Sequence, residues 1–280
     1  TDTILDAVSL LNFLSSTNYY AESIAGSIMG AAKSSTASVA GAFSMVFFYN
    51  NVGANVGSGA DINISGTSYD VYYDSTGDAY YYVKDDTVYT FGDNGVRSES
   101  AKTLDDIKAI SGIAAKGAAV KGMTLYAGDG ANVRIIGGGL SAGSAKAGVG
   151  LALGFLLNQD TVTAQVGANG DITVTNGTYD QKAAGEADVM VITAAMALNS
   201  SAQASATVGG GLNAIATNNK ILSNVLAGTK ITAGGDVSVG TDSDMHLVLV
   251  SLSVSGAASG VAVGGTFGVI VHQGQAIITI

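Results

Sequence analysis

Carboxylates gather in one part of the chain, at residues 70–93, where they could bind a cation. Oxygen-rich loops that contain glycine can hold Ca²⁺. The segment DSTGD (74–78) lacks the full ligand series of an EF-hand, and the glycine-rich nonapeptide calcium repeat does not occur. A solvated acidic face is the favoured interpretation. A Ca²⁺ site is the alternative, and no other cofactor is expected; its candidate ligands are Asp74, Asp78, Asp85 and Asp86.

The same part of the chain is rich in tyrosine, in VYYDSTGDAYYYVKDDTVYTF (71–91). Tyrosine suits contact surfaces because its ring is large, rigid and amphipathic. The alternative is an aromatic hairpin that packs against the side of a scaffold. Both interpretations stay open for the contact candidates Tyr80, Tyr81, Tyr82 and Tyr89.

Catalytic groupings are missing from the sequence. His246 and His272 stand apart from each other, with no cysteine and no metal-ligand spacing, so no nucleophile–base pair can be argued. A carbohydrate-active site would need paired carboxylates, or a base beside a cation, on neighbouring strands. The basic residues outside 70–146 do not recur at a fixed spacing; they are Lys33, Lys182, Lys220 and Lys230. The sequence therefore predicts that the chain is not an enzyme.

The composition excludes several other classes. The 280 residues carry a net charge of −10, which argues against nucleic acid and anionic membranes as partners. No apolar run reaches the roughly 18 residues of a membrane helix, so no membrane insertion of this segment is expected. The 39 Gly, with no Pro, Cys or Trp, fit neither disorder nor collagen. Both ends read as cuts within a longer protein.

Internal repeats organise the rest of the chain. Residues 39–70 align with 149–180 without a gap, and further copies begin at Val208 and Val263. The first step between copies is therefore about twice as long as each of the two later steps. We interpret this as a unit of about 55 residues, with two units in the first step, and each unit as about three rungs of roughly 18–20 residues.

Within a unit, short runs of Val, Ile, Thr and Ala alternate with period two and end at Gly/Asn turns. Strands of this kind at a fixed repeat favour a parallel β-solenoid, with a β-sandwich or barrel as the alternative. In the solenoid the repeated apolar residues point inward and stack on their equivalents. These are Val56, Ile62 and Ile64, with Val166, Ile172 and Val174.

Three regions are expected. Residues 1–70 and 147–280 form solenoid rungs, and 71–146 form a tyrosine-rich, charged insertion with hairpins and a short helix. The helix is expected within 98–117, with Ser100 or Thr103 as its N-cap.

The repeats resemble a known family. NYYAESIAGSIMG (18–30), the later VGG and VGL copies, and ITAGGDVSVG (231–240) are similar to repeats of leukotoxin-like, filamentous-haemagglutinin-like giant surface proteins of Gram-negative bacteria. The resemblance covers about residues 18–70 and 147–280. It implies an all-β, right-handed parallel β-helix that is exported to the cell surface by an autotransporter or two-partner route. The matching motif implies no catalytic residues.

The expected function is a non-enzymatic rod segment of a large exported surface protein, in adhesion or in cell–cell or host contact. Its expected partners are surface glycans or proteins, or copies of itself. The alternative is a filament or matrix protein in which solenoids stack end to end. A carbohydrate-active β-helix enzyme is a third class.

Overall fold

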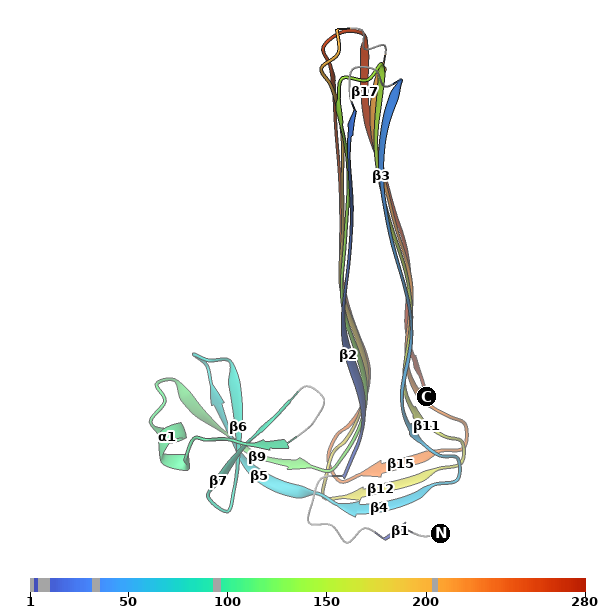
Figure 1. The fold of residues 1–280 in the computed structure, drawn as a ribbon. Coiled ribbons are helices and arrows are strands. Elements are labelled where there is room, and N and C mark those ends of the chain that lie inside the picture. Colours follow the sequence, from blue (N-terminus) through green and yellow to red (C-terminus); the bar gives the residue numbers. More distant parts are fainter. Residues whose placement is uncertain (1–2, 5–10, 32–35, 93–96, 203–205) are drawn as a thin grey trace.

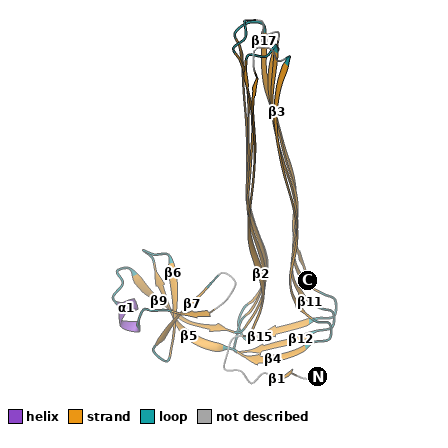
Figure 2. Cartoon of the chain, in the orientation of Figure 1, coloured by secondary structure: helices purple, strands orange, loops and turns teal. Residues whose placement is uncertain are grey.

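The computed structural model describes residues 3–4, 11–31, 36–92, 97–202 and 206–280. Over these residues the chain is all-β, with three sheets of parallel strands and one antiparallel sheet. The described part has a single helix, α1 (Leu104–Lys108). Two of the parallel sheets are built from very long strands, of 19 to 21 residues each, and they extend far beyond the rest of the molecule (Figures 1 and 2).

The two long sheets have four strands each, and we call them the first and second long sheets. The first contains, in spatial order, β16 (Val237–Ala257), β13 (Tyr179–Asn199), β10 (Met123–Gly143) and β2 (Leu11–Ala31). The second contains β17 (Val261–Thr279), β14 (Ala206–Val225), β11 (Ala147–Val166) and β3 (Ala37–Val56). Short strands form a base sheet at one end: β1 (Thr3–Ile4), β4 (Asp61–Ser65), β12 (Asp171–Thr175) and β15 (Lys230–Ala233).

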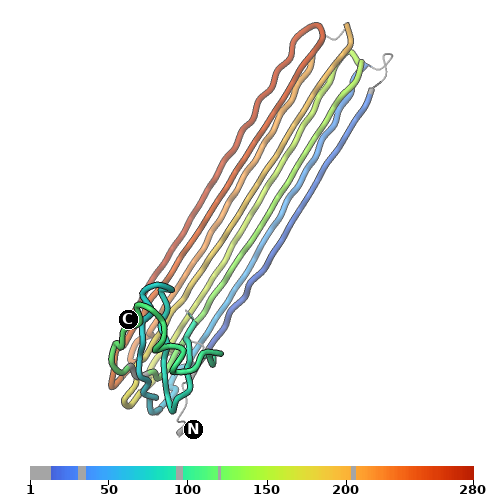
Figure 3. The backbone as a smooth tube through the Cα atoms, turned by 90° about the vertical axis from the view of Figure 1, so that its left-hand side faces the viewer, coloured from blue at the N-terminus to red at the C-terminus, as the bar shows by residue number. Residues whose placement is uncertain are grey.

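The chain makes repeated circuits through these three sheets. It runs away from the base on β10, returns on β11, crosses the base on β12, and begins the next circuit on β13 (Figure 3). Each strand pairs in parallel with its equivalent in the next circuit, so Met123 at the start of β10 lies beside Tyr179 at the start of β13. One repeat unit is therefore one whole circuit of two long strands and one short strand. The prediction of three shorter rungs in each unit was wrong.

The first repeat step, from Val39 to Val149, also differs from the prediction of two units. Val39 on β3 pairs directly with Val149 on β11, so the two copies belong to adjacent circuits. The extra residues leave the circuit at Thr67 and return at Lys121. They form the antiparallel side sheet, ordered β8 (Arg97–Glu99), β7 (Thr87–Phe91), β6 (Ala79–Lys84), β5 (Thr67–Asp74) and β9 (Ile113–Lys121).

The side sheet contains the hairpins and the helix expected between 71 and 146, but with different limits. Residues 123–143 form β10, which pairs along its whole length with β2 and β13. The boundary expected at 146 is thus too late, because the alternating pattern of the long strands already resumes at Met123. Thr103 is the N-cap of α1: its side chain accepts a hydrogen bond from the Asp106 backbone, and the Asp106 side chain accepts one from the Thr103 backbone.

Near the base the core is conventional. Val56, Ile62 and Ile64 are buried and lie beside Val166, Ile172 and Val174 of the next circuit. The predicted inward stacking of these six residues is confirmed. Together with Leu125, Tyr179 and others they form the largest hydrophobic cluster.

In the distal half, away from the base, the pattern is reversed. Buried inward positions carry small side chains, such as Ser141, Gly150, Ala152 and Ala195. A Cβ on Gly150 would collide with the Met196 carbonyl, so the two sheets approach closely there. Large apolar side chains instead project outward on both sheets, as Ile28 (81% exposed) and Phe43 (53%) illustrate. The distal half is a thin two-sheet blade with apolar outer faces.

Candidate functional site

The four predicted Ca²⁺ ligands lie in or beside turns of the side sheet, with Asp74 as the last residue of β5. Asp74 is buried between β5 and β6, where one carboxylate oxygen accepts hydrogen bonds from the backbone nitrogens of Thr76 (2.8 Å) and Gly77 (3.0 Å). Asp78 accepts a hydrogen bond from the Tyr73 hydroxyl at 2.8 Å. These carboxylates therefore stabilise a turn and a strand pair.

The other two, Asp85 and Asp86, join β6 to β7. Their φ angles are 51° and 62°, which is the left-handed conformation that a tight two-residue hairpin requires at both central positions. Aspartate tolerates this conformation better than most residues. Among the described residues, no group of three or more acidic or histidine side chains is placed to hold a metal ion.

The tyrosine candidates divide between the interior and the surface of the side sheet. Tyr81 is buried in the small core with Val83, Val88 and Ile107. Tyr82 and Tyr89 are half-buried and meet the ring of Tyr69 edge to face. Only Tyr80 of the four is exposed (50%), and its ring lies 4.7 Å from that of Tyr73. Packing therefore occupies most of this aromatic cluster.

Two basic side chains, Lys102 and Arg97, interact with these aromatic residues. Lys102 Nζ donates a hydrogen bond to the Tyr81 hydroxyl at 2.8 Å, and Arg97 donates one to the Tyr69 hydroxyl at 3.1 Å. The Arg97 guanidinium also lies 4.8 Å from the centroid of the Tyr89 ring, a cation–π distance. The hydrogen bond from Lys102 to Tyr81 raises the pKa of this lysine.

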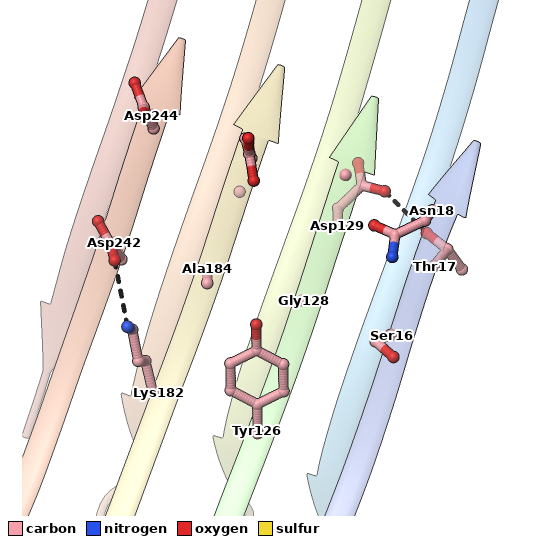
Figure 4. Close-up of a pocket in the computed structure, with 13 residues that line it drawn as sticks. Ser16, Thr17, Asn18, Tyr126, Gly128, Asp129, Lys182, Ala184, Asp242 and Asp244 are labelled. Carbon is pink, nitrogen blue, oxygen red and sulfur yellow. Dashed lines mark hydrogen bonds and ion pairs between the residues drawn. The ribbon is translucent and has the colours of Figure 1, made fainter. Parts of the chain in front are cut away.

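A polar groove of about 460 Å³ crosses the outer face of the first long sheet, on the half nearer the base (Figure 4). Four adjacent strands contribute, and small residues at Gly128, Gly130 and Ala184 leave room above the sheet. Lys182 forms an ion pair with Asp242 at 3.1 Å. The polar and aromatic side chains that line the groove are Ser16, Thr17, Asn18, Tyr126, Asp129, Lys182, Glu186, Asp242 and Asp244.

Sequence reasoning missed this groove. Its residues are far apart in the chain and come together because Ser16, Gly128, Ala184 and Asp242 share one row of the sheet. The signal is that two neighbouring outward positions are polar or small in every circuit, as in the row of Ser16 and the row of Asn18. It becomes readable only when the length of the full circuit is known, and three shorter rungs would place these residues on different levels.

A polar layer lies between the two long sheets, directly behind the groove. Asp129 also lines the groove wall, and it accepts hydrogen bonds from Thr17 Oγ1 and Asn50 Nδ2, both at 2.7 Å. Asp160 accepts one from Asn158 Nδ2 at 2.6 Å and a longer one from the Tyr19 hydroxyl at 3.4 Å. The layer separates the cluster near the base from the smaller cluster around Val133 and Ile215.

Burial dominates the electrostatics of this layer. Loss of solvation raises the pKa of Asp160 to about 6, with a smaller contribution from the negative charge of Asp129 and partial compensation by the hydrogen bonds. Burial also raises the pKa of Asp129, against the hydrogen bonds from Thr17 and Asn50. The pKa of Tyr19 is raised by burial first and then by both aspartates. Asp160 therefore takes up a proton in mildly acidic solution.

The two histidines make single contacts only. His246 lies 3.2 Å from Asp188, its neighbour in the same row. His272 lies 2.7 Å from Thr217, in the row that also contains Asn158. Neither histidine lines the polar groove.

Chemically, the groove offers carboxylate and amide oxygens, one ammonium group, two aliphatic hydroxyls and one phenol ring. This set can hydrogen-bond a ligand that is rich in hydroxyl groups and present a ring to its apolar face. The acidic cluster at residues 70–93 does not line the groove.

Comparison with protein-family models, with curated proteins and with solved structures found no match. Among the residues that the structure describes, no helix has the length and apolar character needed to cross a membrane.

Proposed function

We propose that this chain is a non-enzymatic rod segment of a large exported bacterial surface protein that mediates adhesion. The observation that carries the proposal is the in-register parallel pairing of the long strands over successive circuits. Such pairing makes a stiff, extended scaffold from residues that have no reactive role. A scaffold of this kind holds a binding surface away from its point of attachment.

The finer fold assignment is part of the proposal: a right-handed parallel β-helix. Crossover connections between parallel strands of one sheet are right-handed in about 98% of cases. Export and a cell-surface location rest on the resemblance of the repeats, above all ITAGGDVSVG at 231–240, to giant surface proteins. The high glycine content and the absence of cysteine fit the same assignment.

Surface glycans are the proposed ligands, and the polar groove is their proposed site. The groove combines the ring of Tyr126 with hydrogen-bonding groups on the neighbouring strands, including Asn18, Glu186 and Asp244. The exposed Tyr80, with the half-buried Tyr73 beside it on the side sheet, is a second contact candidate.

The alternative is a filament in which copies stack end to end. The edge strands favour it, because β3 and β17 occupy opposite edges of one sheet and carry similar outward residues. In the common row register, Val39 corresponds to Val263 and Phe43 to Phe267. An unpaired edge strand is a template for further pairing.

Binding to an array of immobilised bacterial and host glycans tests the adhesion proposal. Wild-type chain is expected to bind a subset of glycans, and Tyr126→Ala and Asp244→Ala to weaken that binding. Tyr49→Ala, at an exposed position of β3 in the second long sheet, is the matched control, because this residue lies outside both contact candidates. Equal binding by all variants would move the ligand site away from the groove. Shortening of a polysaccharide during incubation with the chain would contradict the non-enzymatic assignment. Fibres in electron micrographs, together with no binding to any glycan, would favour the filament.

A further inference from the structure

The distal outer face of the first long sheet is apolar over its whole width. We define the distal face as the outward positions of four rows that cross β2, β10, β13 and β16. The rows are Ile24–Ile136–Ile192–Val250, Gly26–Gly138–Ala194–Leu252, Ile28–Leu140–Met196–Val254 and Gly30–Ala142–Leu198–Gly256. None of the sixteen residues is charged. Ile24 (68%), Ile28 (81%) and Leu252 (57%) are among the exposed ones.

The rows alternate between large and small side chains. The Ile24 and Ile28 rows are ridges, and the Gly26 row between them is a groove of about 710 Å³ over β2, β10 and β13. The Gly26 and Gly30 rows are each small on three of their four strands, with Leu252 and Leu198 as the exceptions. Successive rows are about 6.6 Å apart, because outward residues alternate along a strand.

This relief is complementary to itself. A two-fold axis parallel to the rows, between the Gly26 and Ile28 rows, turns a second copy upside down, so that the Ile28 row faces the Gly26 row and the Ile24 row faces the Gly30 row. Ile28, Leu140 and Met196 of one copy then lie over Gly26, Gly138 and Ala194 of the other. With the Ile24 row over the Gly30 row, a large side chain faces a small one in six of the eight pairs; the exceptions are Val254 over Leu252 and Ile192 over Leu198. An interface of this kind uses the same patch on both copies.

We propose that the distal face is a self-association surface, through which two copies pack antiparallel with ridges in grooves. The blades then overlap at their distal halves, and the two bases point in opposite directions. The arrangement stands on the row pattern alone, independently of the proposed glycan binding.

The area of the distal face determines how strongly two copies are expected to associate. Four strands at about 4.8 Å and seven residues at about 3.3 Å give a flat area of about 440 Å² on each copy. Two copies together cover about 900 Å², which is below the roughly 1,200 Å² of stable specific interfaces and within the range of weak, transient ones. A weak dimer with a dissociation constant in the micromolar range is therefore expected.

A lipid phase fits the observations less well. β2 and β16 are edge strands, and their unpaired backbone groups would be costly in hydrocarbon. Acyl chains also need no alternation of large and small rows. The regular relief points to a partner with the same spacing, which is another β-sheet of this chain.

Sedimentation equilibrium of the purified chain tests the proposal, with Gly138→Lys as the principal variant. A Cβ at Gly138 meets nothing nearer than the Ala194 carbonyl at 3.8 Å, so the fold accepts a side chain that points into the groove. Gly265→Lys, on the outer face of the second long sheet, is the matched control, because a Cβ there meets nothing within 4 Å. Ala194→Lys, on an exposed position of the neighbouring strand, is a second variant.

Wild type and Gly265→Lys are expected to dimerise alike, and Gly138→Lys and Ala194→Lys to raise the dissociation constant at least tenfold. Circular dichroism confirms that each variant is folded. A wild type that stays monomeric at all concentrations overturns the proposal, as does a dimer that resists both first-sheet variants. Flotation of a monomeric wild type with phosphatidylcholine vesicles, abolished by Gly138→Lys, assigns the face to lipid instead.

Discussion

Asp160 makes the stability of the chain depend on pH in an unusual direction. Its carboxyl is 5% exposed between the two long sheets, and burial raises its pKa to about 6, with Asp129 and Tyr19 as the titratable neighbours. In the unfolded chain an aspartate has a pKa of about 3.9. The folded state therefore binds a proton more tightly than the unfolded state. The resulting stabilisation is present at low pH and is lost as pH rises through the folded pKa.

The magnitude follows from these two pKa values. Between pH 7 and pH 5, protonation of Asp160 should raise the free energy of unfolding by about 1.3 kcal/mol. In Asp160→Asn this contribution is absent, because the amide cannot ionise. Asp129 remains in the variant and its pKa is also raised, so the variant keeps part of the pH dependence. The prediction therefore concerns the free energy of unfolding as a function of pH: its slope should differ between wild type and Asp160→Asn.

Urea unfolding, followed by circular dichroism at pH 5, 6 and 7, measures this difference. Asp85→Asn, in an exposed turn of the side sheet, controls for the loss of a carboxylate elsewhere. Wild type should gain about 1.3 kcal/mol more than Asp160→Asn on going from pH 7 to pH 5. Equal slopes in wild type and Asp160→Asn would refute the assignment of a buried, proton-binding carboxyl to this position.

Three further predictions concern stability, and each is measured by urea or thermal unfolding. Ile172→Ala, in the core near the base, should cost about 2–5 kcal/mol, whereas the outward Thr173→Ala should have little effect; similar losses would contradict the inward stacking. Gly150→Ala should destabilise the blade because its Cβ meets the Met196 carbonyl, and Gly265→Ala should not, unless the sheets are farther apart than described. Thr103→Ala should cost about 1 kcal/mol by removing the N-cap of α1, and no loss would mean that the cap contributes nothing.

The all-β character and the inward residues of the repeat could be predicted from the sequence. Val56, Ile62 and Ile64 recur at a fixed spacing, and only inward stacking explains why apolar residues alternate with polar ones there. The N-cap at Thr103 could also be predicted, since Asp106 three residues later completes the reciprocal pair. These features depend on residues that are close in sequence or one repeat apart.

The length of the circuit could not be predicted, because Gly-rich segments were read as turns. In GGGLSAG (137–143) the glycines lie inside β10, where Gly139 is needed for close approach of the second sheet and not for a bend. Strands of about 20 residues are far longer than usual. Because of that error the polar groove was not predicted, since its rows depend on the register of the full circuit. The same error placed the end of the insertion at 146 instead of at Lys121.

The outer faces of the blade could not be anticipated either. Ile24 and Ile28 alternate with smaller residues, and such a pattern normally places the large residues inside. Here the glycine, alanine and serine positions face the other sheet, since a close approach of two backbones leaves no room for larger side chains. The sequence alone has no signal that distinguishes this reversed half from the conventional half near the base.

One distance tests most directly that each repeat is a single circuit of long strands. Ser238 lies at the base end of β16, and Ala258 directly follows its distal end. The chain has no cysteine, so a pair of cysteines at these two positions can carry spin labels without interference. An extended strand between these positions predicts a separation of about 65 Å by double electron–electron resonance. A separation below about 30 Å, as the shorter rungs would give, contradicts the account.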